Sequence, residues 1–142
     1  MSLMNVKSYA AGQWIAPDDT AREIESAITG HVIARAGTRE IDAQAMLDHA
    51  RTIGGPNLRK LTFHDRARML KALAQHLTEN KQALYDISYN TGATKRDHAF
   101  DIDGGIGTTF VFASKGRREM PDGHVLSDGD LEQLSRSGSF LG

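Results

Sequence analysis

Two helix-start signals of the same kind constrain the fold of this chain more than any other feature. Thr62-Phe63-His64-Asp65 and Thr94-Lys95-Arg96-Asp97 each place a threonine three residues before an aspartate. In such a capping box the hydroxyl and the carboxylate bind backbone N–H groups that the first helical turn leaves unpaired. We therefore predict that Thr62 and Thr94 are N-caps and that a helix begins after each of them.

Apolar residues at a spacing of three or four, which marks one face of a helix, follow both starts. After Thr62 these residues are Phe63, Ala67, Leu70, Ala74, Leu77, Leu84 and Ile87, and after Thr94 they are Ala99, Ile102, Ile106, Phe110 and Ala113. Polar residues around Lys81 interrupt the first set, so we expect two helices there, the second closed by Gly92. An earlier helix with Ala43, Met46, Leu47 and Ala50 on one face is expected to end at Gly54-Gly55-Pro56.

Three glycines lie inside the helix expected after Thr94, namely Gly104, Gly105 and Gly107. Each glycine in a helix interior is about 1 kcal/mol less favourable than alanine. A total of roughly 3 kcal/mol must be offset, so we predict that a neighbouring helix or subunit packs closely against these positions.

The N-terminal third indicates short strands. Tyr9–Ile15, Glu23–Ile28 and His31–Ala34 are bounded by turn residues and predict a small antiparallel meander. Met1–Val6 is interpreted as an expression scar and an N-terminal tail. Beyond Pro121, two extended segments are expected at 124–126 and 138–141.

The composition excludes several classes of protein. Lys and Arg number 17 against 18 Asp and Glu, a formal charge of −1, and the positive residues are scattered, which argues against a nucleic-acid partner. No apolar run reaches the roughly 20 residues that span a bilayer, and no secretory signal is present, so a cytoplasmic protein without a membrane partner is expected. The absence of cysteine removes disulfides, thiolate metal sites and a cysteine nucleophile from this stretch.

The motifs that suggest a site do not have the required spacing. Gly105-Ile106-Gly107 lacks the third glycine and the preceding strand of a dinucleotide-binding loop. Asp97, Asp101 and Asp103 are not spaced as calcium ligands, and the six histidines form no pair at metal-ligand spacing. We therefore predict no catalytic, no cofactor-binding and no metal-binding residue in this stretch.

The ordered set of these features resembles the start of the aldehyde dehydrogenase superfamily. The resemblance rests on Gly12-Gln13-Trp14, Thr29-Gly30-His31-Val32-Ile33, Asp65-Arg66-Ala67 with Leu70 and Leu73-Ala74, and Thr91-Gly92. It implies an α/β fold that is the N-terminal fragment of such an enzyme. Residues 7–120 would belong to the NAD(P)-binding domain, with a short meander followed by flanking amphipathic helices, and residues 121–142 would begin the bridging strands for oligomerisation.

A narrower resemblance is to the bifunctional ring-opening branch of that superfamily in aerobic phenylacetate degradation. It rests on Gly54–Arg59, Leu61–Phe63, Thr91–Thr94, Asp101–Thr108 and Arg118–Asp122. It implies a parent enzyme that opens oxepin-CoA with water and oxidises the resulting CoA-linked semialdehyde with NAD or NADP. The semialdehyde dehydrogenases of the benzoyl-CoA epoxide route share much of this region and remain an alternative.

In the family, the nucleophilic cysteine, the glutamate base and the oxyanion donor lie downstream of the region that this chain resembles. The resemblance therefore implies a scaffold that binds no coenzyme by itself, is inactive alone, and has the rest of its own chain and a homo-oligomer as partners. A non-catalytic helical interaction module is the alternative from another class.

Overall fold

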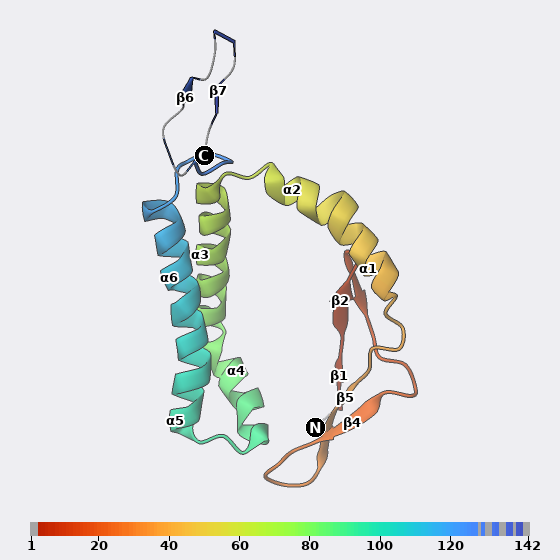
Figure 1. The fold of residues 1–142 in the computed structure, drawn as a ribbon. Helices are drawn as coiled ribbons and strands as arrows, with labels where there is room; N and C mark the ends of the chain where they lie inside the picture. Colours follow the sequence, from red (N-terminus) through yellow and green to blue (C-terminus); the bar gives the residue numbers. More distant parts are fainter. Residues whose placement is uncertain (1–2, 128, 130–131, 134–135, 138, 141–142) are drawn as a thin grey trace.

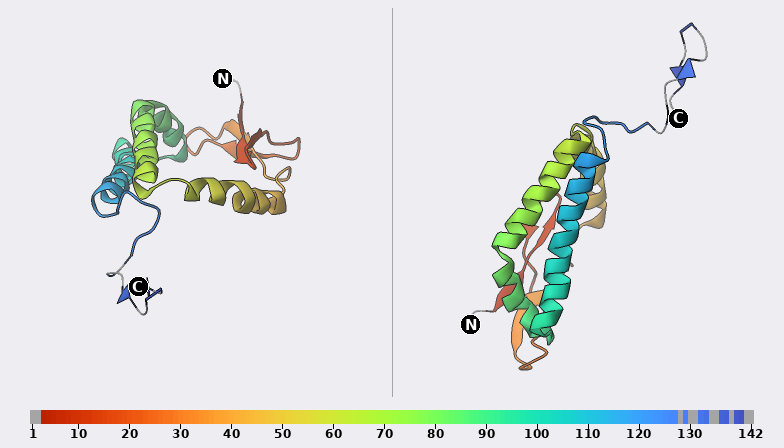
Figure 2. Two further views of the ribbon diagram at one scale, coloured as in Figure 1. Left: turned by 90° about the horizontal axis from the view of Figure 1, so that it is seen from above. Right: turned by 90° about the vertical axis from the view of Figure 1, so that its left-hand side faces the viewer.

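The computed structural model describes residues 3–127, 129, 132–133, 136–137 and 139–140. It has an α/β arrangement in which short strands from the N-terminal part stand beside a layer of helices (Figure 1). Viewed from above, the strands and the helical layer form separate arms that are bridged along one side by an early helix (Figure 2). Within the described residues, the polypeptide thus makes an open arch rather than one packed core.

The larger sheet has the strand order β1–β5–β4. β4 (Arg22–Glu25) pairs antiparallel with β5 (Val32–Ala36), whereas β1 (Met4–Val6) pairs with β5 in parallel. Two sequence predictions are corrected here. The strands do not form a single antiparallel meander, and Met4–Val6 is not a tail, because its backbone groups pair with the second edge of β5, which would otherwise stay open.

A separate hairpin replaces the single strand predicted over Tyr9–Ile15. β2 (Ser8–Ala10) and β3 (Gln13–Ile15) are joined by two residues, Ala11 and Gly12, whose φ angles are +48° and +82°. A two-residue turn with both φ values positive matches the twist of an antiparallel pair, so the chain reverses here instead of continuing.

The first helical stretch runs through the point where an end was predicted. α1 (Ala43–His49), a π-helical segment η1 (Ala50–Gly54) and α2 (Gly55–Arg59) follow one another as a continuous curved helix (Figure 1). The prediction that Gly54-Gly55-Pro56 ends the helix is wrong. Both glycines adopt right-handed helical angles, and the proline lies in the first turn of α2, where its missing N–H is tolerated.

The first capping box is confirmed. α3 (Phe63–Glu79) begins after Thr62, whose Oγ accepts the Asp65 N–H at 3.1 Å, while the Asp65 carboxylate accepts the Thr62 N–H at 3.0 Å. The predicted break is confirmed too, because Asn80 leaves helical angles (φ −104°, ψ 10°) before α4 (Lys81–Ser88).

The second capping box is confirmed in the same way. A 3₁₀ turn, η2 (Tyr89–Thr91), ends at Gly92 with φ +83°, which closes the preceding helix as predicted. Thr94 then starts α5 (Lys95–His98): its hydroxyl accepts the Asp97 N–H at 3.3 Å, and the Asp97 carboxylate accepts the Thr94 N–H at 2.7 Å.

The three glycines lie in helix, as predicted, but their surroundings differ from the prediction. A π-helical segment η3 (Ala99–Asp103) leads into α6 (Gly104–Arg118). A Cβ atom added at Gly104, Gly105 or Gly107 would meet nothing within 4 Å. Among the described residues, nothing packs closely against these positions, so that part of the prediction is wrong. Packing of a further subunit or domain there stays a prediction.

The helical layer is held together where α3 and α6 run side by side in opposite directions (Figures 1 and 2). Small side chains make this contact possible: Ala67 and Ala74 from α3 are 3% and 0% exposed, and Ala113 from α6 is 3% exposed. A Cβ at Gly116 would lie 3.2 Å from the Ala67 Cβ. The glycine that the helix pair requires is therefore Gly116.

The strands and the helical layer meet through few contacts. The Ala27 N–H donates to the Asn90 carbonyl at 2.8 Å, which ties the β4–β5 turn to the end of η2. Beyond α6, β6 (Glu132–Gln133) pairs antiparallel with β7 (Ser139–Phe140). The extended segment predicted at 124–126 forms no strand, and residues 138 and 141 of the other one lie outside the described residues.

Thr94→Ala is expected to lower the free energy of unfolding by about 1 kcal/mol, because the hydroxyl that caps α5 is lost. Thr94→Ser keeps the oxygen and is the matched control, with an expected loss of only a few tenths of a kcal/mol. Urea unfolding of the three proteins measures this difference. Equal losses in both variants would show that the methyl group, rather than the cap, matters.

Candidate functional site

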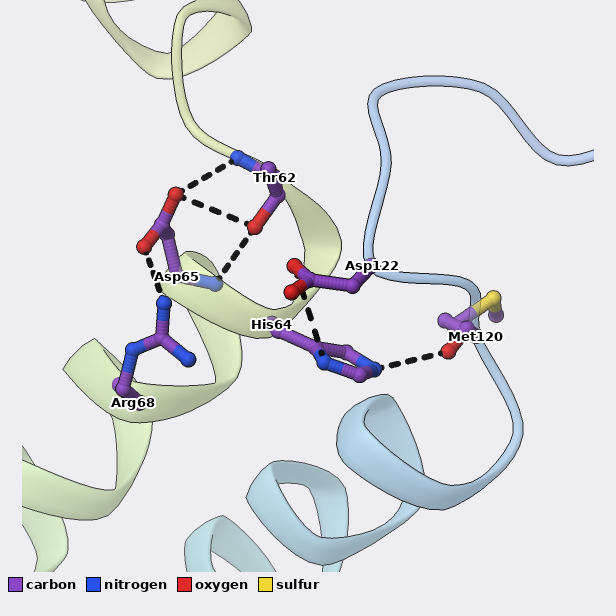
Figure 3. A network of polar contacts seen from close by, with 6 residues as sticks. All are labelled: Thr62, His64, Asp65, Arg68, Met120 and Asp122. Carbon is purple, nitrogen blue, oxygen red and sulfur yellow. Dashed lines mark hydrogen bonds and ion pairs between the residues drawn. The ribbon is translucent and has the colours of Figure 1, made fainter.

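A network of polar side chains lies at the start of α3 (Figure 3). Asp65 closes the capping box with Thr62 and also forms an ion pair with Arg68 one turn later. The Thr62 backbone N–H is the largest cause of a lowered pKa for the Asp65 carboxyl, and hydrogen bonding to Arg68 adds to it. Because these contacts all stabilise the charged carboxylate at a helix start, their role is structural.

His64 extends this cluster to the chain that leaves α6. Its Nε2 lies 2.9 Å from the Met120 carbonyl oxygen, and its Nδ1 lies 3.7 Å from the Asp122 carboxylate (Figure 3). Beside it, the Phe63 N–H donates to the Gly123 carbonyl at 2.9 Å. A histidine–aspartate pair serves catalysis when it activates a nucleophile, but the adjacent Thr62 hydroxyl is already bound to a carboxylate. The pair therefore fixes the segment after α6 against α3.

A second cluster joins α4 to η3. The Asp103 carboxylate accepts the Tyr85 hydroxyl at 2.7 Å and pairs with the Lys81 ammonium at 3.1 Å. The hydrogen bond from Tyr85, followed by that from Lys81, lowers the pKa of Asp103. Lys81, which interrupts the apolar face in the sequence, thus has a structural partner.

His98 is the large side chain that this corner buries, with 1% exposure. Its Nδ1 lies 2.9 Å from the Ser88 hydroxyl oxygen, and its ring packs against Tyr85 and edge-on against Tyr89, with ring centroids 5.6 and 4.3 Å away. The Nε2 atom has no hydrogen-bond partner among the described residues. The imidazole fastens α5 to α4, a role that the sequence pattern did not reveal.

The glycine motif at residues 105–107 lies in a helix. Gly105-Ile106-Gly107 lies within the first turns of α6, with helix before it instead of a strand, so it does not form the strand–loop–helix cradle that binds a pyrophosphate. In the described part of the chain, no three acidic or histidine side chains lie close enough together to hold a metal ion. The grouping of Asp97, Asp101 and Asp103 is therefore not a metal site there.

Two surface grooves accompany α6. The first, of about 420 Å³, is apolar and lined by Leu77, Leu84, Ile87, Ser88, Thr91, Ile102, Gly105 and Ile106. The second, of about 470 Å³, lies between α3 and α6 and is lined by Lys71, Phe110, Ala113, Ser114, Arg117 and Arg118. We call this second groove the basic groove. The sequence analysis missed it because Lys71 and Arg117 come from different helices and meet only through the α3–α6 packing.

Acidification is expected to weaken both helix starts, because Asp65 and Asp97 have a pKa below the ordinary value of 3.8. Such a carboxylate stabilises the fold above its unfolded pKa, and this contribution is lost as the pH falls through the lower, folded pKa. Urea midpoints measured from about pH 7 to about pH 3 should therefore fall less in an Asp65→Asn, Asp97→Asn double variant than in the wild type. An unchanged fall would assign the acid sensitivity to other groups.

The comparison with known proteins gives the class to which this architecture corresponds. Residues 14–137 match the aldehyde dehydrogenase family, and the chain belongs to that family. Members of this family typically use NAD(P), and the match supports an oxidoreductase rather than a free-standing helical interaction module.

A characterised relative is a 3,4-dehydroadipyl-CoA semialdehyde dehydrogenase of Aromatoleum evansii. The two are 34% identical over 140 residues, which cover 98% of this chain and 27% of the relative. The chain thus spans about a quarter of that protein. Among the described residues, no helix is long and apolar enough to cross a membrane.

Proposed function

We propose that this chain is the N-terminal scaffold of an NAD(P)-dependent aldehyde dehydrogenase that oxidises a CoA-linked semialdehyde in aromatic degradation. The observation that carries the proposal is the family match over residues 14–137, together with the similarity to a CoA-semialdehyde dehydrogenase along nearly the whole chain. Residues 7–120 would be part of the coenzyme-binding domain, and residues 121–142 would begin the bridging strands. We place the enzyme in the cytoplasm.

Exposed apolar side chains support the scaffold role. Phe100 is 85% exposed, Val125 is 73% exposed and Phe112 is 60% exposed. These side chains come from η3, from the segment after α6 and from α6 itself, and we assign the surfaces that cover them to the rest of the enzyme's own chain and to a second subunit of a homo-oligomer.

Hydrolytic opening of oxepin-CoA is a second candidate activity of the same enzyme. It is supported by the resemblance carried by Asp101–Thr108, whose glycines leave open space along α6. Benzoyl-CoA epoxide degradation is the competing pathway, because the semialdehyde dehydrogenases of that route share the same resemblance. The relative's name supports a CoA-linked semialdehyde as the substrate in either case.

The test uses the complete protein that carries this chain. With 3,4-dehydroadipyl-CoA semialdehyde and either NAD or NADP, we expect the absorbance of reduced coenzyme to rise. Oxepin-CoA is added in a second assay, where loss of the ring with the formation of the open-chain semialdehyde supports the hydrolase. Absence of coenzyme reduction with any CoA-linked semialdehyde would contradict the proposed function.

A further inference from the structure

The basic groove gathers three positive side chains, and Arg118 alone among them has an acidic partner within the described residues, the Glu119 carboxylate 4.0 Å away. Lys71 comes from the middle of α3, while Ser114, Arg117 and Arg118 come from the last turns of α6. None of the lining residues is acidic. Three positive side chains around one groove favour an anion as its ligand.

Some other cations of the helical layer have acidic partners. Arg68 pairs with Asp65, Lys81 with Asp103, and Lys115 with Glu119 at 3.0 Å. Neither Lys71 nor Arg117 forms an ion pair with any residue in the described part of the chain.

The helix dipole explains only part of this charge. Arg117 and Arg118 lie at the C-terminal end of α6, where positive side chains are favourable. Lys71 lies near the centre of α3, away from both helix ends, so the helix dipole does not favour a positive side chain there. An anionic ligand would give Lys71 and Arg117 the acidic partner that neither has among the described residues.

We propose that the basic groove binds the 3′-phosphorylated adenosine diphosphate of a CoA thioester, an inference that rests on the proposed function. Guanidinium groups bind phosphate through paired N–H donors, and an ammonium group adds a point charge. Phe110, half-buried in the groove wall, offers a ring on which adenine can stack. The volume of about 470 Å³ is in the range of sites for ligands of this size.

NADP carries a related group, an adenosine diphosphate phosphorylated on the 2′ hydroxyl. Both molecules contain a pyrophosphate, so the assignment to CoA rests on the CoA-linked substrate of the proposed function. Direct binding measurements distinguish CoA from NADP as the ligand of the groove.

Calorimetry on the complete protein tests the site with CoA, dephospho-CoA, NADP and inorganic tripolyphosphate. We expect CoA to bind most tightly and dephospho-CoA, which lacks the 3′ phosphate, to bind about tenfold more weakly. Lys71→Glu and Arg117→Glu should each weaken CoA binding by about tenfold. Lys95→Glu, which makes the same charge change on α5 at the far end of α6, should leave it unchanged. Tripolyphosphate bound as tightly as CoA, or NADP bound more tightly, would overturn the proposal.

Steady-state kinetics separate this proposal from the proposed function. Lys71→Glu should raise KM for the CoA-linked semialdehyde about tenfold, with kcat unchanged. The matching N-acetylcysteamine thioester has no nucleotide, so its KM should be the same in the variant as in the wild type. An equal rise for both thioesters would overturn the groove assignment. If the wild-type protein oxidises neither thioester, the proposed function fails, and the CoA calorimetry alone decides the groove.

Discussion

Gly116→Leu is expected to destabilise the helical layer by about 3 kcal/mol, the largest stability effect in this chain, because it forces a side chain between two packed helices. A Cβ at this position already lies 3.2 Å from the Ala67 Cβ, closer than ordinary van der Waals contact. Ala67 is 3% exposed and sits on backbone that cannot move without disturbing α3, so the added atoms must push α3 and α6 apart.

Gly105→Ala is the matched control on the same helix. A Cβ at this position would meet nothing within 4 Å. Alanine also replaces glycine, which is the least favourable residue of a helix interior apart from proline, so the variant should be about 0.5–1 kcal/mol more stable. Chemical denaturation measures both variants. If Gly116→Leu is tolerated while Gly105→Ala is destabilising, the α3–α6 packing described here is wrong.

Gly105→Leu tests the remaining part of the glycine prediction. In the isolated chain it should have little effect, since the position faces open space. In the complete enzyme it should lower stability or assembly if a further domain or subunit packs against α6. Equal behaviour in both settings would show that nothing approaches this face.

The isolated 142-residue chain is expected to show no aldehyde oxidation, and the complete protein is expected to oxidise its substrate. The family reaction begins with a thiolate that attacks the aldehyde, and this chain has no cysteine. The described residues also form no cradle for a coenzyme's pyrophosphate, so binding of NAD or NADP by the chain alone should be below detection.

Two measurements on the isolated chain check this expectation. An aldehyde-dependent absorbance assay should stay at the background rate with either coenzyme, and calorimetry should give no heat of coenzyme binding. The complete protein under the same conditions is the positive control. Turnover, or micromolar coenzyme affinity, in the isolated chain would show that the active site lies within these residues.

Local signals predicted the helical half of the structure well. Both capping boxes, the break before Lys81 and the helix end at Gly92 were confirmed, because each depends on interactions between residues three or four apart. The prediction that a helix ends at Gly54-Gly55-Pro56 was wrong. Glycine and proline only make a helix end favourable, and a π-helical turn followed by a first-turn proline lets the helix continue.

What the sequence by itself determined, then, is the two capped helix starts, the break before Lys81, the helix end at Gly92, and that no thiolate chemistry can arise from these residues. Only the tertiary structure decided the parallel pairing of Met4–Val6 with β5, the burial of His98 and the choice of Gly116 as the glycine at the helix contact. The basic groove also exists only because α3 and α6 run side by side and bring Lys71 to Arg117. Each of these features joins residues far apart in the chain, and one-dimensional periodicity carries no information about which helix faces or strand edges meet.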